Sequence, residues 1–411
     1  MTRALLFGLT LTSTYLMARL LGTAGRGSYA LISAYAGLMF VLSQLGLPSA
    51  LTYFTARGAG VRAMRRLSLR LAGLLAAAVI VVGLLTMPLL QGPGLPLHGV
   101  PAALVVLAVV LVPIQLLSSM TGAILYGLRR FRRYNVIQIA QAALLVVFIA
   151  TFVGLARLEA FGAVLAVVAS QAVGAALVLR EVGFAVGSDR AVRDGGADTV
   201  ETARSASGDA ATTPGGRDRH RPREVISYAL RLYPSLVPSY FSYRQDVLLL
   251  GAFAIPTAQI GLYGVAVNFA EMLFYIPDSI STVLYPTVVG AQRADADRHA
   301  VRVTRFTLLA TLVAGVVLIP ATYAALRLLL PDFEGSMPAF LVILPAVVSL
   351  TVSKVLSSYV AGLGRPGPVT AAAIVSMLVN LAANLILIPR LGIVGASASS
   401  LISYSTQAVL L

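Results

Sequence analysis

The chain lacks cysteine and tryptophan, and it holds only three histidines and one lysine in 411 residues. Without cysteine there is no disulfide framework, no thiolate metal ligand and no thiol nucleophile. The histidines lie outside the long apolar runs, at His98, His220 and His299, which excludes an imidazole acid or base within a membrane. The sequence also has no GxxxxGK[ST] phosphate loop and no acidic cluster with metal-ligand spacing. We therefore expect no cofactor, no metal and no enzymatic activity.

Charged residues are scarce as well, at 11% of the chain against 58% hydrophobic residues and a mean hydropathy of +0.87. A soluble protein carries about 25% charged residues because its surface faces water. The composition therefore predicts an all-α, polytopic integral membrane protein whose solvent is mostly lipid. The net charge of +15 would suit nucleic acid, but the basic residues lie in stretches between apolar runs, so we expect no nucleic-acid partner.

Twelve apolar runs approach the roughly 20 residues that a spanning helix needs. Six lie in the first part of the chain, at residues 4–21, 28–55, 70–91, 102–126, 135–156 and 160–180. Six more follow at residues 227–253, 260–289, 304–329, 338–362, 369–389 and 393–411. We predict two lobes of six transmembrane helices each, at residues 1–180 and 225–411.

Residues 181–224, between the two lobes, differ in composition. They hold seven arginines and eight acidic residues but hardly any large apolar side chain. Such a segment cannot bury enough apolar surface to fold, so we predict a disordered cytoplasmic linker. Its basic end, residues 217–223, either contacts anionic lipid headgroups or serves as an ordinary positive flank of the next span.

Arginines gather in alternate loops. The loops after the second, fourth and eighth runs carry Arg57, Arg62, Arg65, Arg66, Arg70, Arg129, Arg130, Arg132, Arg133, Arg293, Arg298, Arg302 and Arg305. The loops at residues 91–100 and 255–260 carry no basic residue other than a histidine. Because cationic loops resist translocation, we expect the arginine-rich loops and both termini to lie in the cytoplasm.

Short motifs of the first half recur in the second half, as expected of a duplicated unit. GSYAL at 27–31 corresponds to GLYGV at 261–265, YGLR at 126–129 to AGLG at 361–364, and the segment that begins at Gly162 to the one that begins at Gly395. The offsets are 233–235 residues. Because each unit has an even number of spans, both lobes would share one orientation and could rock about a central cavity.

Charged side chains within the apolar runs concentrate in the second lobe. Each costs at least about 2.5 kcal/mol at the bilayer centre, so each needs a partner or a hydrated cavity. They are Arg231, Arg244, Asp246, Glu271, Asp278 and Lys354. One interpretation is that the basic residues bind substrate, and the other is that they neutralise the carboxylates and fix the helix bundle.

The first lobe offers fewer candidates. Arg19 is the cation that we expect to reach the cavity, whereas we interpret Arg26 as an ordinary loop residue. Gln44 and Asn135 are candidate lining residues, and Asn135 begins an uncharged polar stripe that either lines a cavity or binds neighbouring helices.

The second lobe also carries an uncharged pair, Asn380 and Asn384. Their spacing of four residues places them on one face of a helix. Side-chain amides often join helices within a membrane, so we interpret this pair as a helix-packing contact.

Several segments recur in the order of a known family. ARLLG at 18–22, GRGSY at 25–29 and QLGLP at 44–48 lie in the first lobe. YRQDVLLLG at 243–251, IGLY at 260–263, LYP at 284–286 and the run at 380–396 lie in the second. Together they resemble the polysaccharide transporter branch of the multidrug/oligosaccharidyl-lipid/polysaccharide exporter superfamily. Its members flip undecaprenyl-pyrophosphate-linked oligosaccharides across the bacterial inner membrane.

The resemblance implies a MATE-like, V-shaped pair of lobes with gradient-driven alternating access, whose central cationic cavity takes the pyrophosphate while the polyprenyl tail stays among membrane lipids. On this basis we expect the substrate site to contain Arg19, Arg231, Arg244, Lys354, Gln44 and Asn135. Asp246, Glu271 and Asp278 would be counter-ions, any of which could carry a coupling proton. The glycan-linked lipid would be the substrate, and a polysaccharide polymerase or glycosyltransferases would be candidate partners.

Members of that family often continue into a thirteenth and a fourteenth span. Because the chain ends at Leu411 within an apolar run, we expect the C-terminal lobe to be truncated. Three rival functions stay open: a MATE-like small-molecule or drug exporter, a membrane enzyme that polymerises or ligates glycan, and a scaffold in a polysaccharide assembly complex. The short outer loops argue against the enzyme, and the basic bias of residues 227–253 argues against the drug exporter.

Overall fold

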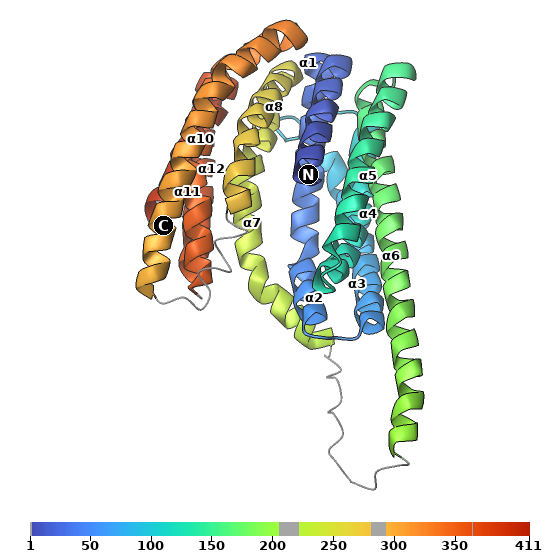
Figure 1. The fold of residues 1–411 in the computed structure, drawn as a ribbon. Coiled ribbons are helices and arrows are strands. Elements are labelled where there is room, and N and C mark those ends of the chain that lie inside the picture. The colour runs from blue at the N-terminus through green and yellow to red at the C-terminus, as the bar shows by residue number, and fades with distance from the viewer. Residues whose placement is uncertain (1, 205–221, 281–292, 364) are drawn as a thin grey trace.

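The structure is a computed structural model that describes residues 2–204, 222–280, 293–363 and 365–411, and its described regular structure is helical (Figure 1). The first half contains α1 Thr2–Gln44, α2 Leu47–Ala56, α3 Val61–Leu90, α4 Ala102–Gly127, α5 Phe131–Ile149 and α6 Glu159–Arg204. The second half contains α7 Pro222–Ala252, α8 Thr257–Glu271, α10 Arg293–Leu329, α11 Met337–Gly362 and α12 Pro366–Leu410. A π-helical turn (η1, Ala150–Leu155) extends α5, a 3-10 turn (η2, Met272–Phe274) extends α8, and another (η3, Pro331–Ser336) precedes α11.

The outer surfaces of the helices are apolar, whereas some of the most polar side chains are buried. Leu74, Leu85 and Phe306 on α3 and α10 expose 67–69% of their surface, while Asn380 and Asn384 are fully buried. This distribution is the reverse of that in a soluble protein. Within the described residues, nine helices are long and apolar enough to cross a membrane. The chain is therefore an all-α, multi-pass membrane protein.

Helix α1 turns back on itself at Gly22. Gly22 has φ 64° and ψ −175°, a left-handed conformation that glycine adopts without the steric cost of a Cβ. After the turn, Nη1 of Arg26 lies 3.8 Å from Sδ of Met17, although nine residues of straight helix would separate them by about 13.5 Å. We call residues 2–21 the first arm and residues 23–44 the second arm of α1. The turn lies between the first two predicted runs, at 4–21 and 28–55, and the second of these runs is divided between α1 and α2.

Helix α12 contains a similar turn at Gly392, with φ 55° and ψ −129°. Its two arms lie against each other, because the Ser376 hydroxyl donates a hydrogen bond of 3.0 Å to the carbonyl oxygen of Ser403. This turn separates the runs that were predicted at 369–389 and 393–411.

Several helices begin or end beyond their predicted apolar runs. Helix α3 begins at Val61 and α10 at Arg293, so the arginines at their beginnings lie on helices and not in loops. Arginine is a good helix former, and its long stem lets the charge reach water from a helix. Helix α6 continues to Arg204, so it extends into the segment from residue 181 for which we predicted a linker. That stretch contains no proline to end the helix. The rest of the predicted linker, residues 205–221, lies outside the described residues.

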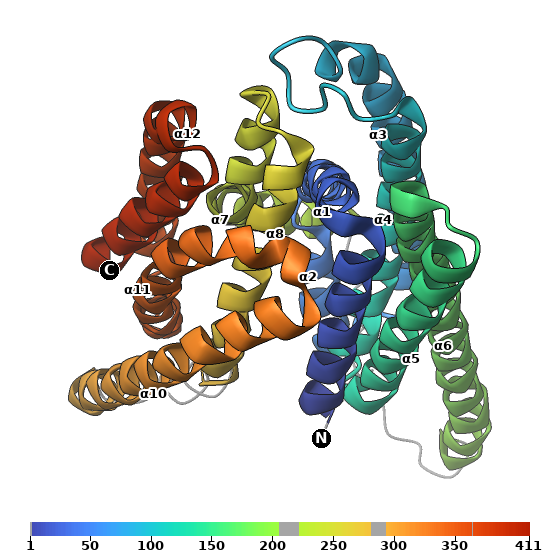
Figure 2. The ribbon, with the colours of Figure 1, turned by 90° about the horizontal axis from the view of Figure 1, so that it is seen from above.

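The two halves meet along α1, α7 and α8, with α3 to α6 on one side and α10 to α12 on the other (Figure 2). One close approach of the two halves involves Gly27 and Gly261. A Cβ built on Gly27 would lie 1.7 Å from the carbonyl oxygen of Thr257, and one on Gly261 would lie 2.0 Å from the carbonyl oxygen of Thr23. Gly27 and Gly261 are 234 residues apart, as are Thr23 and Thr257. The contact is therefore the same in both directions, as expected of duplicated segments that face each other across a two-fold axis.

Helix α7 binds α12 through the predicted asparagine pair. Nε2 of Gln245 lies 2.5 Å from Oδ1 of Asn380, and Nδ2 of Asn384 donates to the same oxygen at 2.8 Å. All three side chains are buried. The packing interpretation of Asn380 and Asn384 is confirmed.

Candidate functional site

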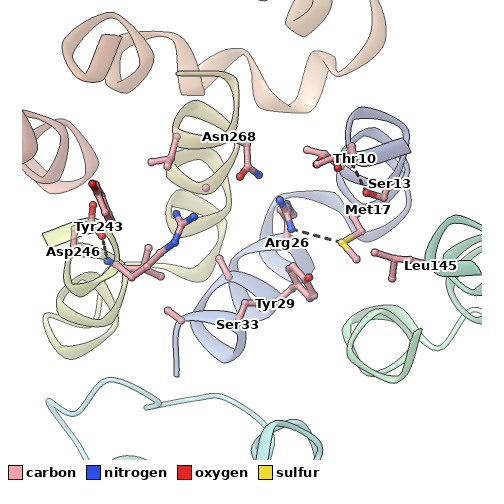
Figure 3. A pocket seen from close by; sticks show the side chains of 17 residues that line it. Thr10, Ser13, Met17, Arg26, Tyr29, Ser33, Leu145, Tyr243, Asp246 and Asn268 are labelled. Atoms are coloured by element: carbon pink, nitrogen blue, oxygen red, sulfur yellow. Dashed lines mark hydrogen bonds between the residues drawn. The ribbon is translucent and has the colours of Figure 1, made fainter. Parts of the chain in front are cut away.

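A pocket of about 290 Å³ lies between the two halves (Figure 3). Both arms of α1 form one side of it, with Leu145 of α5 next to Met17 on that side, and α7 and α8 form the other. The polar side chains in its wall are four aliphatic hydroxyls, two phenols, one amide and three charged groups. The lining residues are Thr10, Ser13, Thr14, Met17, Arg26, Tyr29, Ala30, Ser33, Ala34, Leu145, Tyr243, Arg244, Asp246, Val247, Gly264, Val267 and Asn268.

Arg26, on the second arm of α1, is the most deeply buried cation of the pocket, with 5% of its surface exposed. Its contacts are weak: Nη1 lies 3.8 Å from Sδ of Met17, and the guanidinium carbon lies 5.0 Å from the centre of the Tyr29 ring. Its Nε atom is buried without a hydrogen-bond partner, and among the described residues Arg26 forms no salt bridge. A buried, uncompensated cation is costly. The pocket therefore has the chemistry to attract an anion.

Arg244, on α7, supplies the second cation. Its Nη2 lies 3.0 Å from Oε2 of Glu271, and both side chains are partly exposed, by 36% and 23%. This ion pair joins α7 to α8. Because Arg244 also faces the pocket, an entering anion can compete with Glu271 for the guanidinium.

Asp246 is held differently. Its side chain is almost completely buried; it accepts a hydrogen bond from the hydroxyl of Tyr263 and another, of 2.8 Å, from the backbone N–H of Val247. Tyr263, on α8, is itself fully buried. Asp246 is thus held by two hydrogen bonds from the protein, and its bond to Tyr263 ties α7 to α8.

Asp278 and Lys354 lie in a separate cavity of the second half, which has a volume of about 360 Å³. Nζ of Lys354 lies 2.7 Å from Oδ1 of Asp278 and 4.1 Å from the centre of the Phe274 ring. Tyr243 lines both this cavity and the central pocket. The six predicted buried charges therefore do not form a single cluster.

Neutralising both members of the Lys354–Asp278 pair tests whether Lys354 binds substrate. We expect the Lys354→Met, Asp278→Asn double variant to transport within about twofold of the wild type, because a surface-accessible ion pair contributes only about 0–1 kcal/mol. Transport by reconstituted protein is the measurement. A loss of transport in the double variant, with unchanged thermal stability, would indicate that Lys354 binds the substrate.

Besides Lys354, Asp278 and Glu271, four more predicted site residues do not line the central pocket. Arg19 is exposed, and its Nη1 donates a hydrogen bond of 3.0 Å to the hydroxyl of Tyr15. Arg231 is exposed on α7, and Gln44 and Asn135 are half-buried on α1 and α5. The sequence indicated their depth along each helix but not the face on which each side chain lies.

The interpretation of Arg26 as a loop residue is wrong, because Arg26 lies within α1 and lines the pocket. The turn at Gly22 is tight enough for the second arm to begin before this arginine. The repeat contained the signal that could have identified it. Arg26 directly precedes Gly27, the repeat landmark that lies in close contact with α8.

Comparison with known proteins places the chain in a family. A family model described as polysaccharide biosynthesis protein matches residues 5–292, well over half of the chain. The probable flippase AglR of Haloferax volcanii is 26% identical over 175 residues, which cover 40% of this chain and 36% of that protein. A probable low-salt glycan biosynthesis flippase of the same organism is 21% identical over 196 residues, or 46% and 41% of the two chains. These matches span about two fifths of the length of the curated relatives.

Two solved structures share the fold over nearly the whole chain. The lipid II flippase MurJ, in an inward closed conformation, has a TM-score of 0.70 at 13% identity and covers 99% of this chain and 86% of its own. An inward-facing MATE multidrug resistance transporter of the MOP superfamily has a TM-score of 0.68 at 15% identity and covers 98% and 92%. The fold is thus that of the superfamily that the sequence motifs indicated. The chain belongs to the polysaccharide biosynthesis protein family.

Proposed function

We propose that this protein flips an undecaprenyl-pyrophosphate-linked oligosaccharide across the bacterial inner membrane for surface polysaccharide synthesis. The observation that carries the proposal is Arg26, a buried cation without a salt bridge among the described residues, which faces the same pocket as Arg244. A diphosphate offers each guanidinium a bidentate, charge-assisted partner. The family match and the likeness to flippases support the same substrate class.

The proposed topology is twelve spans in two six-helix lobes, residues 1–180 and 225–411, with the N-terminus in the cytoplasm. Nine apolar helices among the described residues support it. Helices α1 and α12 each consist of two arms and would supply two spans each. The polar α7, with 31 residues, is long enough to be a further span. The arginines at the beginnings of α3 and α10 support the orientation. The contact between Gly27 and Gly261 would close the outer end, so that the pocket would open toward the cytoplasm.

The pocket suggests how a proton gradient would drive the lobes through alternating access. A diphosphate that binds Arg26 would also draw Arg244 away from Glu271. Glu271 would then lack its counter-ion, whereas Asp246 would keep its bonds from Tyr263 and Val247. Of the three predicted coupling residues, Glu271 is therefore our candidate for the proton carrier.

A MATE-like small-molecule exporter is the second candidate, because MATE transporters share the fold. Export of an organic cation would need a carboxylate that is free to bind it. In the central pocket, Asp246 is bonded to Tyr263, and the neighbouring Glu271 is paired with Arg244. Arg26, by contrast, is a buried cation of the pocket whose Nε has no hydrogen-bond partner among the described residues, which favours an anionic substrate.

Depletion of the protein in its host tests the proposed function. We expect polyprenyl-linked glycan to accumulate on the cytoplasmic leaflet, because its diphosphate cannot cross the bilayer unaided. Accessibility of the glycan to a membrane-impermeant enzyme, in right-side-out and inverted vesicles, is the measurement. An unchanged distribution of the glycan between leaflets contradicts the proposal.

A further inference from the structure

A third cavity, with a volume of about 420 Å³, lies mainly in the first half and is lined by four glutamines from three helices. We call it the glutamine chamber. Gln115 comes from α4, Gln138 and Gln141 from α5, and Gln171 from α6. Its lining contains no charged residue among those that the structure describes; the other members are Gly37, Phe40, Val41, Ser118, Ser119, Tyr134 and Tyr240.

The chamber adjoins the central pocket along three helices. On the second arm of α1, Gly37 lines the chamber and Ala34 lines the pocket. On α7, Tyr240 lines the chamber and Tyr243 lines the pocket. On α5, Gln141 lines the chamber and Leu145 lines the pocket. Three or four residues of helix correspond to one turn, or about 5.4 Å. A ligand in the pocket therefore has the chamber as its immediate neighbour.

Two of the four glutamine side chains in the chamber form no hydrogen bond with the described part of the protein. Among the described residues, neither Gln115 nor Gln171 has a hydrogen-bond partner for its side chain, and Oε1 of Gln115 is buried. Gln138, by contrast, is fixed by a hydrogen bond of 2.6 Å from its Nε2 to the hydroxyl of Tyr134. Gln141 packs against Gly174, where a Cβ would lie 2.4 Å from Oε1. Two of the four glutamines are thus positioned by the protein, and two are left for a ligand.

This chemistry suits an uncharged sugar. Each side-chain amide both donates and accepts, as does each sugar hydroxyl, so the two can form paired hydrogen bonds. Tyrosine and phenylalanine rings offer flat apolar surfaces for the C–H face of a pyranose. The uncharged lining disfavours the diphosphate itself, which belongs to the arginines of the central pocket.

We propose that the glutamine chamber binds the first sugars of the lipid-linked oligosaccharide while Arg26 and Arg244 bind its diphosphate. This inference rests on the proposed function, because it assumes that a diphosphate occupies the central pocket. It makes Gln115 and Gln171 specificity-determining residues for the glycan.

Binding of two probes to the purified full chain in nanodiscs tests the inference. The probes are undecaprenyl diphosphate and the same lipid with a neutral disaccharide. The wild type is expected to bind the glycosylated lipid about 5- to 10-fold more tightly, the gain of one or two neutral hydrogen bonds. The Gln115→Met, Gln171→Met double variant should lose that gain and keep its affinity for the sugar-free lipid. Gln259→Met, at an exposed position on α8, is the matched control.

The outcomes separate the chamber from the proposed function. If the wild type binds the sugar-free lipid but gains nothing from the disaccharide, or if the double variant keeps the gain, the chamber inference is overturned. If the wild type binds neither lipid, the diphosphate site of the proposed function fails as well. An equal loss for both probes in the double variant would assign the two glutamines a structural role. The free disaccharide, which lacks the diphosphate, should not displace the glycosylated lipid when it is added at the concentration at which that lipid saturates the protein.

Discussion

The Arg26→Met variant should bind undecaprenyl diphosphate about 10- to 100-fold more weakly than the wild type, because hydrogen bonds to charged groups contribute about 1.5–3 kcal/mol. The same variant should be more resistant to thermal unfolding. Arg26 is 5% exposed and forms no salt bridge among the described residues, so methionine removes a buried charge and leaves no ionic partner behind. Lipid binding and unfolding temperature, measured on one preparation, report both effects.

The opposite signs of these two effects distinguish a substrate-binding arginine from a structural one. Arg19→Met is the matched control, because Arg19 lies on the first arm of the same helix but is exposed and does not line the pocket. It should change neither binding nor stability appreciably. If Arg26→Met lowers the unfolding temperature and leaves lipid affinity unchanged, Arg26 is structural and the diphosphate site lies elsewhere.

The membrane fold could be predicted because lipid imposes strong compositional constraints. Long apolar runs separated by arginine-rich stretches are typical of transmembrane helices and their cytoplasmic connections. The run boundaries were less accurate at α3 and α10, whose first turns carry arginines and still form helix. Hydropathy measures what a segment can bury, and it does not measure where the backbone stops being helical. The same limit accounts for the extension of α6 beyond residue 181, where we predicted a linker.

The candidate site was less predictable because membership of a pocket depends on the face of a helix. Arg244 and Arg231 lie on the same helix, yet Arg244 lines the pocket and Arg231 is exposed. Asp246 was identified from its charge, but its partner Tyr263, although part of the repeated GLYGV segment, has no charge that would have marked it as a site residue. Arg26 was misassigned because its role depends on a tight turn four residues earlier, at Gly22.

Replacing Gly27 with valine is expected to open the contact between α1 and α8 and to abolish transport. A Cβ at Gly27 would lie 1.7 Å from the carbonyl oxygen of Thr257, so the two helices must separate. Overpacking of this kind costs about 1–3 kcal/mol, enough to shift a two-state equilibrium about 5- to 150-fold. Because the chain has no cysteine, spin labels can be placed on cysteines introduced at Leu20 and Gln259, both exposed near this contact. The label-to-label distance should lengthen in the variant.

Because the contact is the same in both directions, a substitution of the partner glycine tests the same prediction. Gly261→Val should lengthen the same distance, because its Cβ would lie 2.0 Å from the carbonyl oxygen of Thr23. Gly315→Ala, on α10, is the matched control, since a Cβ there lies 3.7 Å from Cδ1 of Leu273, an ordinary contact, and Gly315 does not line the central pocket. It should leave both distance and transport unchanged. If Gly27→Val and Gly261→Val keep the wild-type distance and still transport, the glycine contact is not part of the mechanism, and the lobes must move about a different point.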